Sequence, residues 1–256
     1  MLLYVCFPCG ALTITSTSRT IKITMEPSMH VNTGVFDRDG ADEIKPASFY
    51  AALTISLLWG LALTAIVAYL TMKAQYAPGW GGVIVYGLVI PIIGIFIAVK
   101  SENPLVSFIG YNMLVIPFGA ILGPVLNHYS PNVIRNAFGI TAGITFLMGF
   151  AGTCFPNLFK NLGAPLFLAL SGLLIVRIAQ IFVPELASLT FIDYIAAGIF
   201  TLYIGFDMYR ASAVPKTLDN AVDISLDLYL DVVNLFLTLL RILGESRKSS
   251  CWLWLY

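Results

Sequence analysis

The sequence predicts an all-α integral membrane protein, a bundle of seven membrane segments. Composition is the first reason. Of the 256 residues 58% are hydrophobic and 11% are charged, whereas soluble domains carry about 25% charged residues. Only nine charged residues fall in the 161 residues from 49 to 209. These values exclude a soluble globular enzyme, and the zero net charge gives no electrostatic reason to expect a nucleic-acid partner.

Recurring apolar blocks are the second reason. A helix rises about 1.5 Å per residue, so roughly 20 apolar residues cross a bilayer core of about 30 Å. Blocks of this length follow one another, separated by short polar joints. The seven predicted segments are Phe49–Met72, Gly81–Val99, Leu105–Leu126, Asn136–Cys154, Ala164–Phe182, Phe191–Tyr209 and Ala221–Leu243.

Residues 1–47 are predicted to be a leader and a disordered polar arm outside the bundle. Residues 1–24 lack the basic cluster of a secretory signal, and residues 25–47 are rich in closely spaced charges. Cys6 and Cys9 form a C-x-x-C motif without the second pair that a zinc site needs, so we expect them to be inert. The transmembrane domain is expected at 48–244, followed by a tail at 245–256.

Prolines and glycines in the segments predict how the helices are shaped and packed. Pro91, Pro117 and Pro124 predict kinks that neighbouring helices must cover. The pairs Gly119/Gly123 and Gly139/Gly143 have the spacing that lets two membrane helices approach closely. A compact bundle is therefore expected.

The lysines and arginines of the joints predict the orientation, because these residues are retained on the cytoplasmic side. With a cytoplasmic N-terminus, eight basic residues fall on the inner face and only Lys73 and Arg135 on the outer one. The inner set is Arg19, Lys22, Arg38, Lys45, Lys100, Lys160, Arg210 and Lys216. Whether the seventh segment crosses fully is left open by this count.

The seventh segment carries a polar stripe. Asp223, Asp227 and Asp231 are spaced by four residues and Asn234 follows three later, a spacing that places them on one helical face. Each carboxylate would cost about 2.5–3.5 kcal/mol in hydrocarbon. This face is therefore expected to point into the bundle or into a water-filled cavity.

Asp207 lies near the end of the sixth segment, at a depth similar to that of Asp231, so the two carboxyl groups are expected to be neighbours. Two buried carboxyl groups this close share one proton. Such a pair would form a proton-sensitive latch, which a divalent cation such as Ca²⁺ could also neutralise. The alternative that the spacing leaves open is a surface salt bridge from Asp207 to Arg210.

Arg177 and Asp193 form a second candidate charge pair, because both lie toward the same side of the bundle. Mutual neutralisation is the expected role, and gating is the alternative. No nucleophile elbow, phosphate loop or metal-ligand spacing is found in the sequence. We therefore expect no catalytic residues, no enzyme activity and no cofactor, and we assign no residue to a resident metal.

Two runs resemble a known family. Tyr-Ile-Gly-Phe-Asp-Met at 203–208 and Leu-Tyr-Leu-Asp-Val-Val-Asn-Leu-Phe-Leu-Thr-Leu-Leu-Arg-Ile-Leu-Gly at 228–244 resemble the C-terminal signature of the transmembrane Bax inhibitor motif (Bax inhibitor-1-like) family. The resemblance implies six helices around a seventh and a pH-sensitive Ca²⁺ leak sensed by two aspartates, which match Asp207 and Asp231. Asp223, Asp227 and Asn234 are left as candidates for the ion path.

Two functions follow as expectations. The first is a Ca²⁺ leak channel in a lipid bilayer, gated by the Asp207–Asp231 pair. The alternative is a non-conducting membrane regulator of a partner such as a membrane protease or a stress or cell-death complex. Short joints and the absence of an Asn-x-Ser/Thr glycosylation site favour a bacterial inner membrane over an organelle membrane.

Overall fold

The computed structural model describes residues 43–76, 78–183 and 190–244, and within these ranges the regular structure is helical, with no strand. Six spans there are long and apolar enough to cross a membrane. The predicted all-helical architecture is confirmed. The helices are α1 (Pro46–Lys73), α2 (Trp80–Ile84), α3 (Ile90–Lys100), α4 (Pro104–Leu126), α5 (Pro131–Cys154), α6 (Pro156–Phe159), α7 (Gly163–Phe182), α9 (Thr190–Ala213) and α10 (Leu218–Gly244).

The second span is continuous but not uniformly α-helical. A π-helical turn, η2 (Val85–Val89), joins α2 to α3 and ends two residues before Pro91. Proline cannot donate the usual backbone hydrogen bond and its ring clashes with the preceding turn, so a wider turn fits here. Pro117 and Pro124 lie inside α4, which continues through both.

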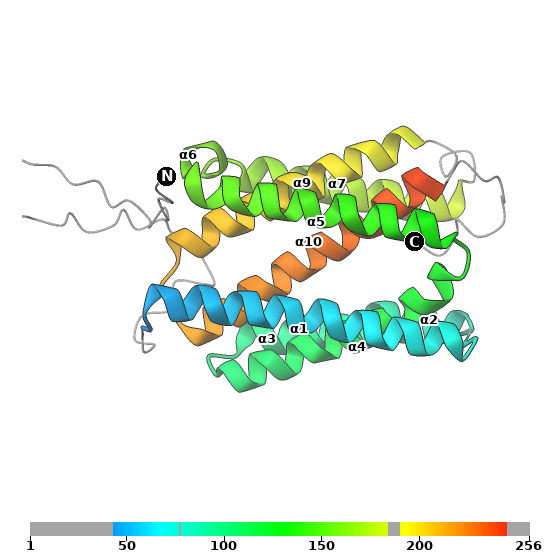
Figure 1. Ribbon diagram of the computed structural model, residues 1–256, viewed down its shortest axis with the longest axis horizontal. Coiled ribbons are helices and arrows are strands. Elements are labelled where there is room, and N and C mark those ends of the chain that lie inside the picture. Colours follow the sequence, from blue (N-terminus) through cyan, green and yellow to red (C-terminus); the bar gives the residue numbers. More distant parts are fainter. Residues whose placement is uncertain (1–42, 77, 184–189, 245–256) are drawn as a thin grey trace, which may run out of the picture.

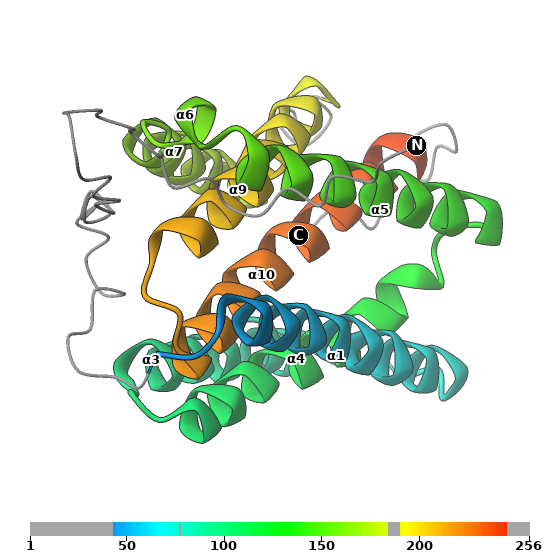
Figure 2. The same cartoon turned by 60° about the vertical axis from the view of Figure 1, so that its left-hand side comes forward.

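The helices form two groups with α10 between them. One group contains α1, α3 and α4, the other contains α5, α7 and α9, and α10 packs against α1, α4, α5 and α9 (Figures 1 and 2). Its residues Ile224, Leu228, Val232 and Leu235 join the core cluster with α1 and α9. Its residues Val222, Leu226, Tyr229 and Val233 join the cluster with α4. Because two faces of α10 are buried against opposite groups, this helix holds the bundle together.

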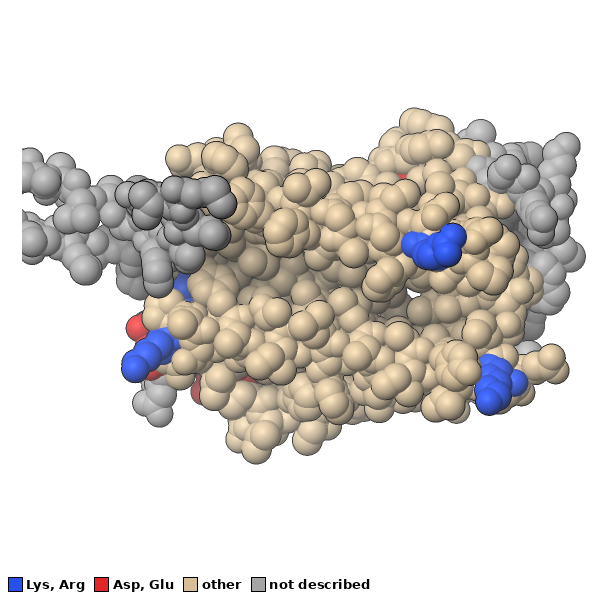
Figure 3. Space-filling model, in the orientation of Figure 1, with Lys and Arg blue, Asp and Glu red and all other residues tan. Residues whose placement is uncertain are grey.

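The outer surface is apolar between two charged ends. Figure 3 shows tan side chains over the middle of the molecule and blue or red ones mainly toward the ends of its long axis. Large apolar side chains stand exposed here, including Phe146 at 76% and Leu168 at 70% of their full area. A surface of this kind suits hydrocarbon rather than water.

The two glycine pairs behave differently. A Cβ on Gly123 would meet the backbone of Ala68 and Met72 in α1, and one on Gly119 would meet Val67. The predicted close approach is therefore found between α1 and α4. It is wrong for Gly139/Gly143, where an added Cβ would meet nothing within 4 Å, because this face of α5 points away from the other helices.

The N-terminal and C-terminal predictions lie mostly outside the described residues. Residues 1–42, with Cys6 and Cys9, and residues 245–256 fall outside them. The described end of the arm is anchored, because the backbone N–H of Ile44 donates to the carbonyl oxygen of Lys216 at 2.8 Å. This bond ties the start of α1 to the connection between α9 and α10.

Candidate functional site

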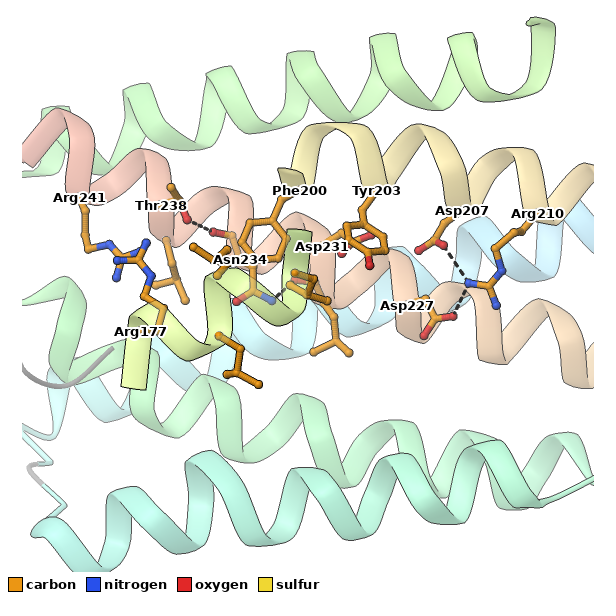
Figure 4. A pocket seen from close by; sticks show the side chains of 15 residues that line it. Arg177, Phe200, Tyr203, Asp207, Arg210, Asp227, Asp231, Asn234, Thr238 and Arg241 are labelled. Atoms are coloured by element: carbon orange, nitrogen blue, oxygen red, sulfur yellow. Dashed lines mark hydrogen bonds and ion pairs between the residues drawn. The ribbon is translucent and has the colours of Figure 1, made fainter. Parts of the chain in front are cut away.

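A cavity of about 450 Å³ lies between α7, α9 and α10. Leucines of α7 and α10 supply apolar walls, and α9 contributes Phe200, Tyr203, Asp207 and Arg210. Figure 4 shows Asp207, Arg210 and Asp227 at one end of this cavity and Arg177 and Arg241 at the other. We call these the acidic end and the arginine end.

The polar stripe of α10 forms the floor of the cavity. The lining residues Asp227, Asp231, Asn234, Thr238 and Arg241 follow one another at alternating spacings of four and three, which keeps them on one helical face. They extend over about 21 Å at 1.5 Å per residue. The stripe is therefore longer than predicted: Thr238 and Arg241 continue it toward the C-terminus.

Asp223 does not belong to this lining. It is buried, with 3% of its area exposed, but it is not among the residues that line the cavity. Asp223 still lies on the predicted face, because it precedes Arg241 by 18 residues, which is five full turns of 3.6 residues. It is outside the lining because it lies about 6 Å nearer the N-terminus of α10 than Asp227, beyond the last residue of the stripe that lines the cavity.

Asp207 and Asp231 meet at the acidic end. Their carboxyl groups are close enough for a side-chain hydrogen bond with each other, and both residues are buried. An ionised carboxylate only accepts hydrogen bonds, so a bond between two carboxyl groups requires a proton on one of them. The structure thus brings together the two residues that the sequence paired.

Arg210 joins the same cluster. Its Nη1 donates to Asp207 Oδ1 at 2.9 Å and to Asp227 Oδ2 at 3.0 Å. The ion pair from Asp207 to Arg210 that the spacing left open is therefore present together with the carboxyl contact. It is not a surface pair, because the Asp207 side chain is only 3% exposed.

Arg177, Asp193 and Arg241 form an ion-pair cluster at the arginine end. Arg177 Nη2 lies 2.5 Å and Arg241 Nη2 lies 3.0 Å from the same Asp193 Oδ1. Arg177 also donates to Gln180 Oε1 at 3.0 Å. The Arg177–Asp193 pair matches the candidate pair from the sequence, whereas Arg241 was missed there. Its spacing of seven residues from Asn234 could have revealed it.

The charges around the cavity nearly balance. Among the described residues four carboxyl groups and three guanidinium groups line it or pair with residues that do: the carboxyl groups of Asp193, Asp207, Asp227 and Asp231, and the guanidinium groups of Arg177, Arg210 and Arg241. With one proton shared by Asp207 and Asp231, three negative charges face three positive charges around the cavity. Loss of that proton would leave the cavity as a whole with one net negative charge.

Nothing in the described part of the chain resembles a resident metal site, since no three histidine, cysteine or acidic side chains converge there to hold an ion. Asn234 uses its amide to donate to the carbonyl oxygen of Leu230 at 2.8 Å. Asn234 itself belongs to the polar stripe that lines the cavity.

Lys216 closes the connection from α9 to α10, outside the membrane segments. Its Nζ donates to the carbonyl oxygens of Ala211, Ser212 and Val214 at 2.8–2.9 Å and lies 5.2 Å from the centre of the Phe49 ring. Burial lowers the pKa of Lys216 to about 8. From the sequence this lysine was predicted only as an inner-face charge, because its contacts depend on the fold.

Comparison with known proteins gives the following relatives. Residues 49–248 match the family described as inhibitor of apoptosis-promoting Bax1. The inner membrane protein YbhL of Escherichia coli K12 is 26% identical over 217 residues, covering 78% of this chain and 91% of YbhL. An uncharacterized protein of Borreliella burgdorferi is 29% identical over 208 residues, 74% and 88% of the two chains. Bax inhibitor 1 of Schizosaccharomyces pombe is 34% identical over 138 residues, 52% and 50%. The family match includes every residue that lines the cavity.

Proposed function

The chain belongs to the Bax inhibitor-1-like family of multi-pass membrane proteins, and from this premise we propose that it is a Ca²⁺ leak channel closed by a proton shared between Asp207 and Asp231. The observation that carries the proposal is the contact between these two buried carboxyl groups beside a polar cavity. Their helices are joined by a short connection, so a change in the pair acts directly on the α9–α10 packing.

Proton loss supplies the driving force for opening. Two unit charges about 4 Å apart repel by roughly 4 kcal/mol at an effective dielectric constant near 20. An energy of that size changes an equilibrium roughly 10³-fold. Arg210 offsets only part of the negative charge on Asp207 and Asp227. The additional negative charge that appears when the shared proton leaves is therefore uncompensated. Separation of α9 from α10, or entry of a cation, reduces the resulting repulsion.

Calcium suits the acidic end because carboxylate and carbonyl oxygens are its preferred ligands. An ion passing along the cavity would meet the carboxylates of Asp207, Asp227 and Asp231 at successive places in the lining, with Asn234 one turn further. The ion is cargo here and needs no resident site. Asp223 has no part in this path, because it lies outside the lining.

We place the N-terminus and the acidic end on the cytoplasmic side of a bacterial inner membrane. The distribution of basic residues in the joints supports this orientation. The similarity to a protein named as an inner membrane protein of E. coli supports the location. Epitope insertion at either terminus with protease protection in spheroplasts tests both statements.

The flux assay tests the gate. The protein is reconstituted in liposomes and Ca²⁺ entry is recorded from about pH 6 to about pH 8. This is the range in which we expect a buried carboxyl pair to lose its shared proton. Wild type should conduct more as the pH rises. Asp231→Asn keeps a hydrogen-bond donor toward Asp207 but cannot ionise, so its entry should stay low at every pH.

The matched control is Asp219→Asn. Asp219 is also a buried acid of α10, but it accepts a hydrogen bond from Ser107 at 2.7 Å and lies outside the cavity lining. This variant should keep the pH dependence of wild type. Wild-type behaviour of Asp231→Asn would contradict the proposed gate.

A second candidate function is a non-conducting regulator of another membrane protein, such as a protease or a stress or cell-death complex. The observation in its favour is the similarity to a fission yeast protein named Bax inhibitor 1. Partner binding should depend on the arm at residues 25–47, whereas a conducting bundle should tolerate its removal. A pull-down with and without this arm, performed beside the flux assay, separates the two functions.

A further inference from the structure

Helix α7 covers the cavity and packs mainly against α9 among the other helices. Its Leu170, Leu173, Leu174 and Arg177 line the cavity. Leu168 and Ile175 on its far side are 70% and 68% exposed, as expected for a lipid-facing surface. α7 is therefore a cavity wall with lipid behind it.

One carboxylate links this wall to the two helices beneath it. Asp193 Oδ1 on α9 accepts from Arg177 of α7 and pairs with Arg241 of α10. Both guanidinium groups turn toward each other at the arginine end of the cavity (Figure 4). Two cations held this close repel unless an anion lies between them, so Asp193 determines whether α7 is drawn toward α10 or pushed away.

We propose that Asp193 is a positioning residue, an electrostatic clasp that holds α7 over the cavity and keeps its arginine end closed. With the clasp intact, an ion entering from this end meets two guanidinium groups and a closed wall. When the clasp opens, Arg177 moves away with α7 and the cavity becomes accessible. The link to ion passage rests on the proposed function, but the closure itself does not.

The test measures access to the cavity without measuring Ca²⁺. The four native cysteines are changed to serine, and Asn234→Cys places a thiol in the middle of the lining. Proteoliposomes are treated with a membrane-impermeant trimethylammonium thiosulfonate, and the rate of thiol modification is recorded. Thr238→Cys is a second reporter on the same stripe.

The variants separate an electrostatic clasp from ordinary packing. Asp193→Asn keeps the size of the side chain and should raise the modification rate at least about tenfold, which corresponds to a shift of about 1.4 kcal/mol in the opening equilibrium. Asp193→Glu keeps the charge and should stay within about twofold of the parent protein. Adding Arg177→Gln to Asp193→Asn removes the repulsion and should lower the rate again.

Asp219→Asn is the matched control, because it makes the same change in a buried acid that lies outside the cavity lining, and it should leave the rate unchanged. Equal rates for Asp193→Asn and the parent, or a double variant as reactive as Asp193→Asn, would overturn the clasp. Gel filtration and the thermal midpoint of each variant identify a loss of fold. If Asp193→Asn does not fold, Asp193→Glu is measured with both reporters, and a labelling rate more than about twofold above that of the parent protein would overturn the clasp. A rise in labelling without any Ca²⁺ flux would refute the proposed function and leave the clasp intact.

Discussion

Arg210 of α9 reaches across to Asp227 of α10, with its Nη1 3.0 Å from Asp227 Oδ2. The same nitrogen lies 2.9 Å from Asp207 Oδ1, so a single guanidinium group holds two acids from different helices. A link of this kind holds α9 against α10 at the acidic end. In the proposed gate it also supplies the positive charge beside which Asp207 and Asp231 would ionise.

Under the proposed gate, replacement of Arg210 should change the pH midpoint of Ca²⁺ entry. A nearby cation favours the ionised form of a carboxyl group, by about one to three pH units when it lies within a few ångströms. Arg210→Gln removes that charge, so the midpoint of Ca²⁺ entry should move to higher pH by about one unit or more. The midpoint is read from entry rates into liposomes across a pH series.

Arg210→Lys is the control for this change. It keeps the positive charge but loses the planar fork that contacts two carboxylates together, so a smaller shift of the midpoint is expected. A midpoint in Arg210→Gln equal to that of wild type, or moved to lower pH, would contradict the assigned role.

Lys216 should make the stability of the protein depend on alkaline pH. Burial lowers the pKa of its amine from 10.5 to about 8, while Glu43 acts in the opposite direction. Between these two values the unfolded chain binds the proton more than the folded one, so stability rises with pH through this window. The thermal midpoint in detergent should therefore rise between about pH 8 and about pH 10.

The control compares two lysines. Lys216→Met should flatten the rise, whereas Lys73→Met, at an exposed position at the end of α1, should retain it. A thermal midpoint that falls over this pH range in wild type but not in Lys216→Met would show that the sign is wrong.

Close packing of α1 on α4 should be sensitive to a single methyl group. Gly123→Ala adds a Cβ against the carbonyl oxygen of Ala68 and the amide nitrogen of Met72. Backbone cannot move aside as a side chain can, so the free energy of unfolding should fall by about 1–3 kcal/mol. Gly143→Ala adds the same group where nothing lies within 4 Å and should cost nothing. Unfolding in mixed micelles measures both, and equal losses would refute the packing argument.

Much of the fold was predictable because each membrane helix corresponds to an apolar block long enough to cross a bilayer. The predicted segment Leu105–Leu126 corresponds to α4 at Pro104–Leu126, and Ala164–Phe182 corresponds to α7 at Gly163–Phe182. Helices in lipid must satisfy their backbone groups internally, so the apolar run and the helix coincide. The glycine pairs show the limit: equal spacing at Gly119/Gly123 and Gly139/Gly143 gave one close contact and one open face.

The site was predictable where residues lie close along one helix or across one short connection. Asp207 and Asp231 were paired from their depth alone. Asp223 and Arg241 show what was missed. Asp223 lies on the predicted helical face but beyond the end of the cavity, which the spacing does not reveal, and Arg241 was read as part of an apolar run. The contact of Arg241 with Asp193 joins residues 48 positions apart, and no local pattern encodes such a distance.

Two tyrosines in the core offer a further test, because their hydroxyl groups differ while their rings contact each other. The rings of Tyr111 and Tyr229 are 5.6 Å apart, edge to face. The hydroxyl of Tyr229 is 2.6 Å from Thr64 Oγ1, in a hydrogen bond between α1 and α10. The hydroxyl of Tyr111 is buried without a hydrogen-bond partner among the described residues.

Removal of each hydroxyl should therefore have opposite effects. Tyr229→Phe loses a buried hydrogen bond and leaves Thr64 to its long contact with the Val115 carbonyl at 3.5 Å, so the free energy of unfolding should fall by about 0.5–1.5 kcal/mol. Tyr111→Phe removes a polar group that burial only penalises, so its stability should be unchanged or higher. Both variants keep the ring contact, which makes the hydroxyl the only difference. The thermal midpoints in one detergent decide the matter: a greater loss in Tyr111→Phe than in Tyr229→Phe would mean that the hydroxyl of Tyr111 stabilises the core and that the Tyr229–Thr64 bond does not.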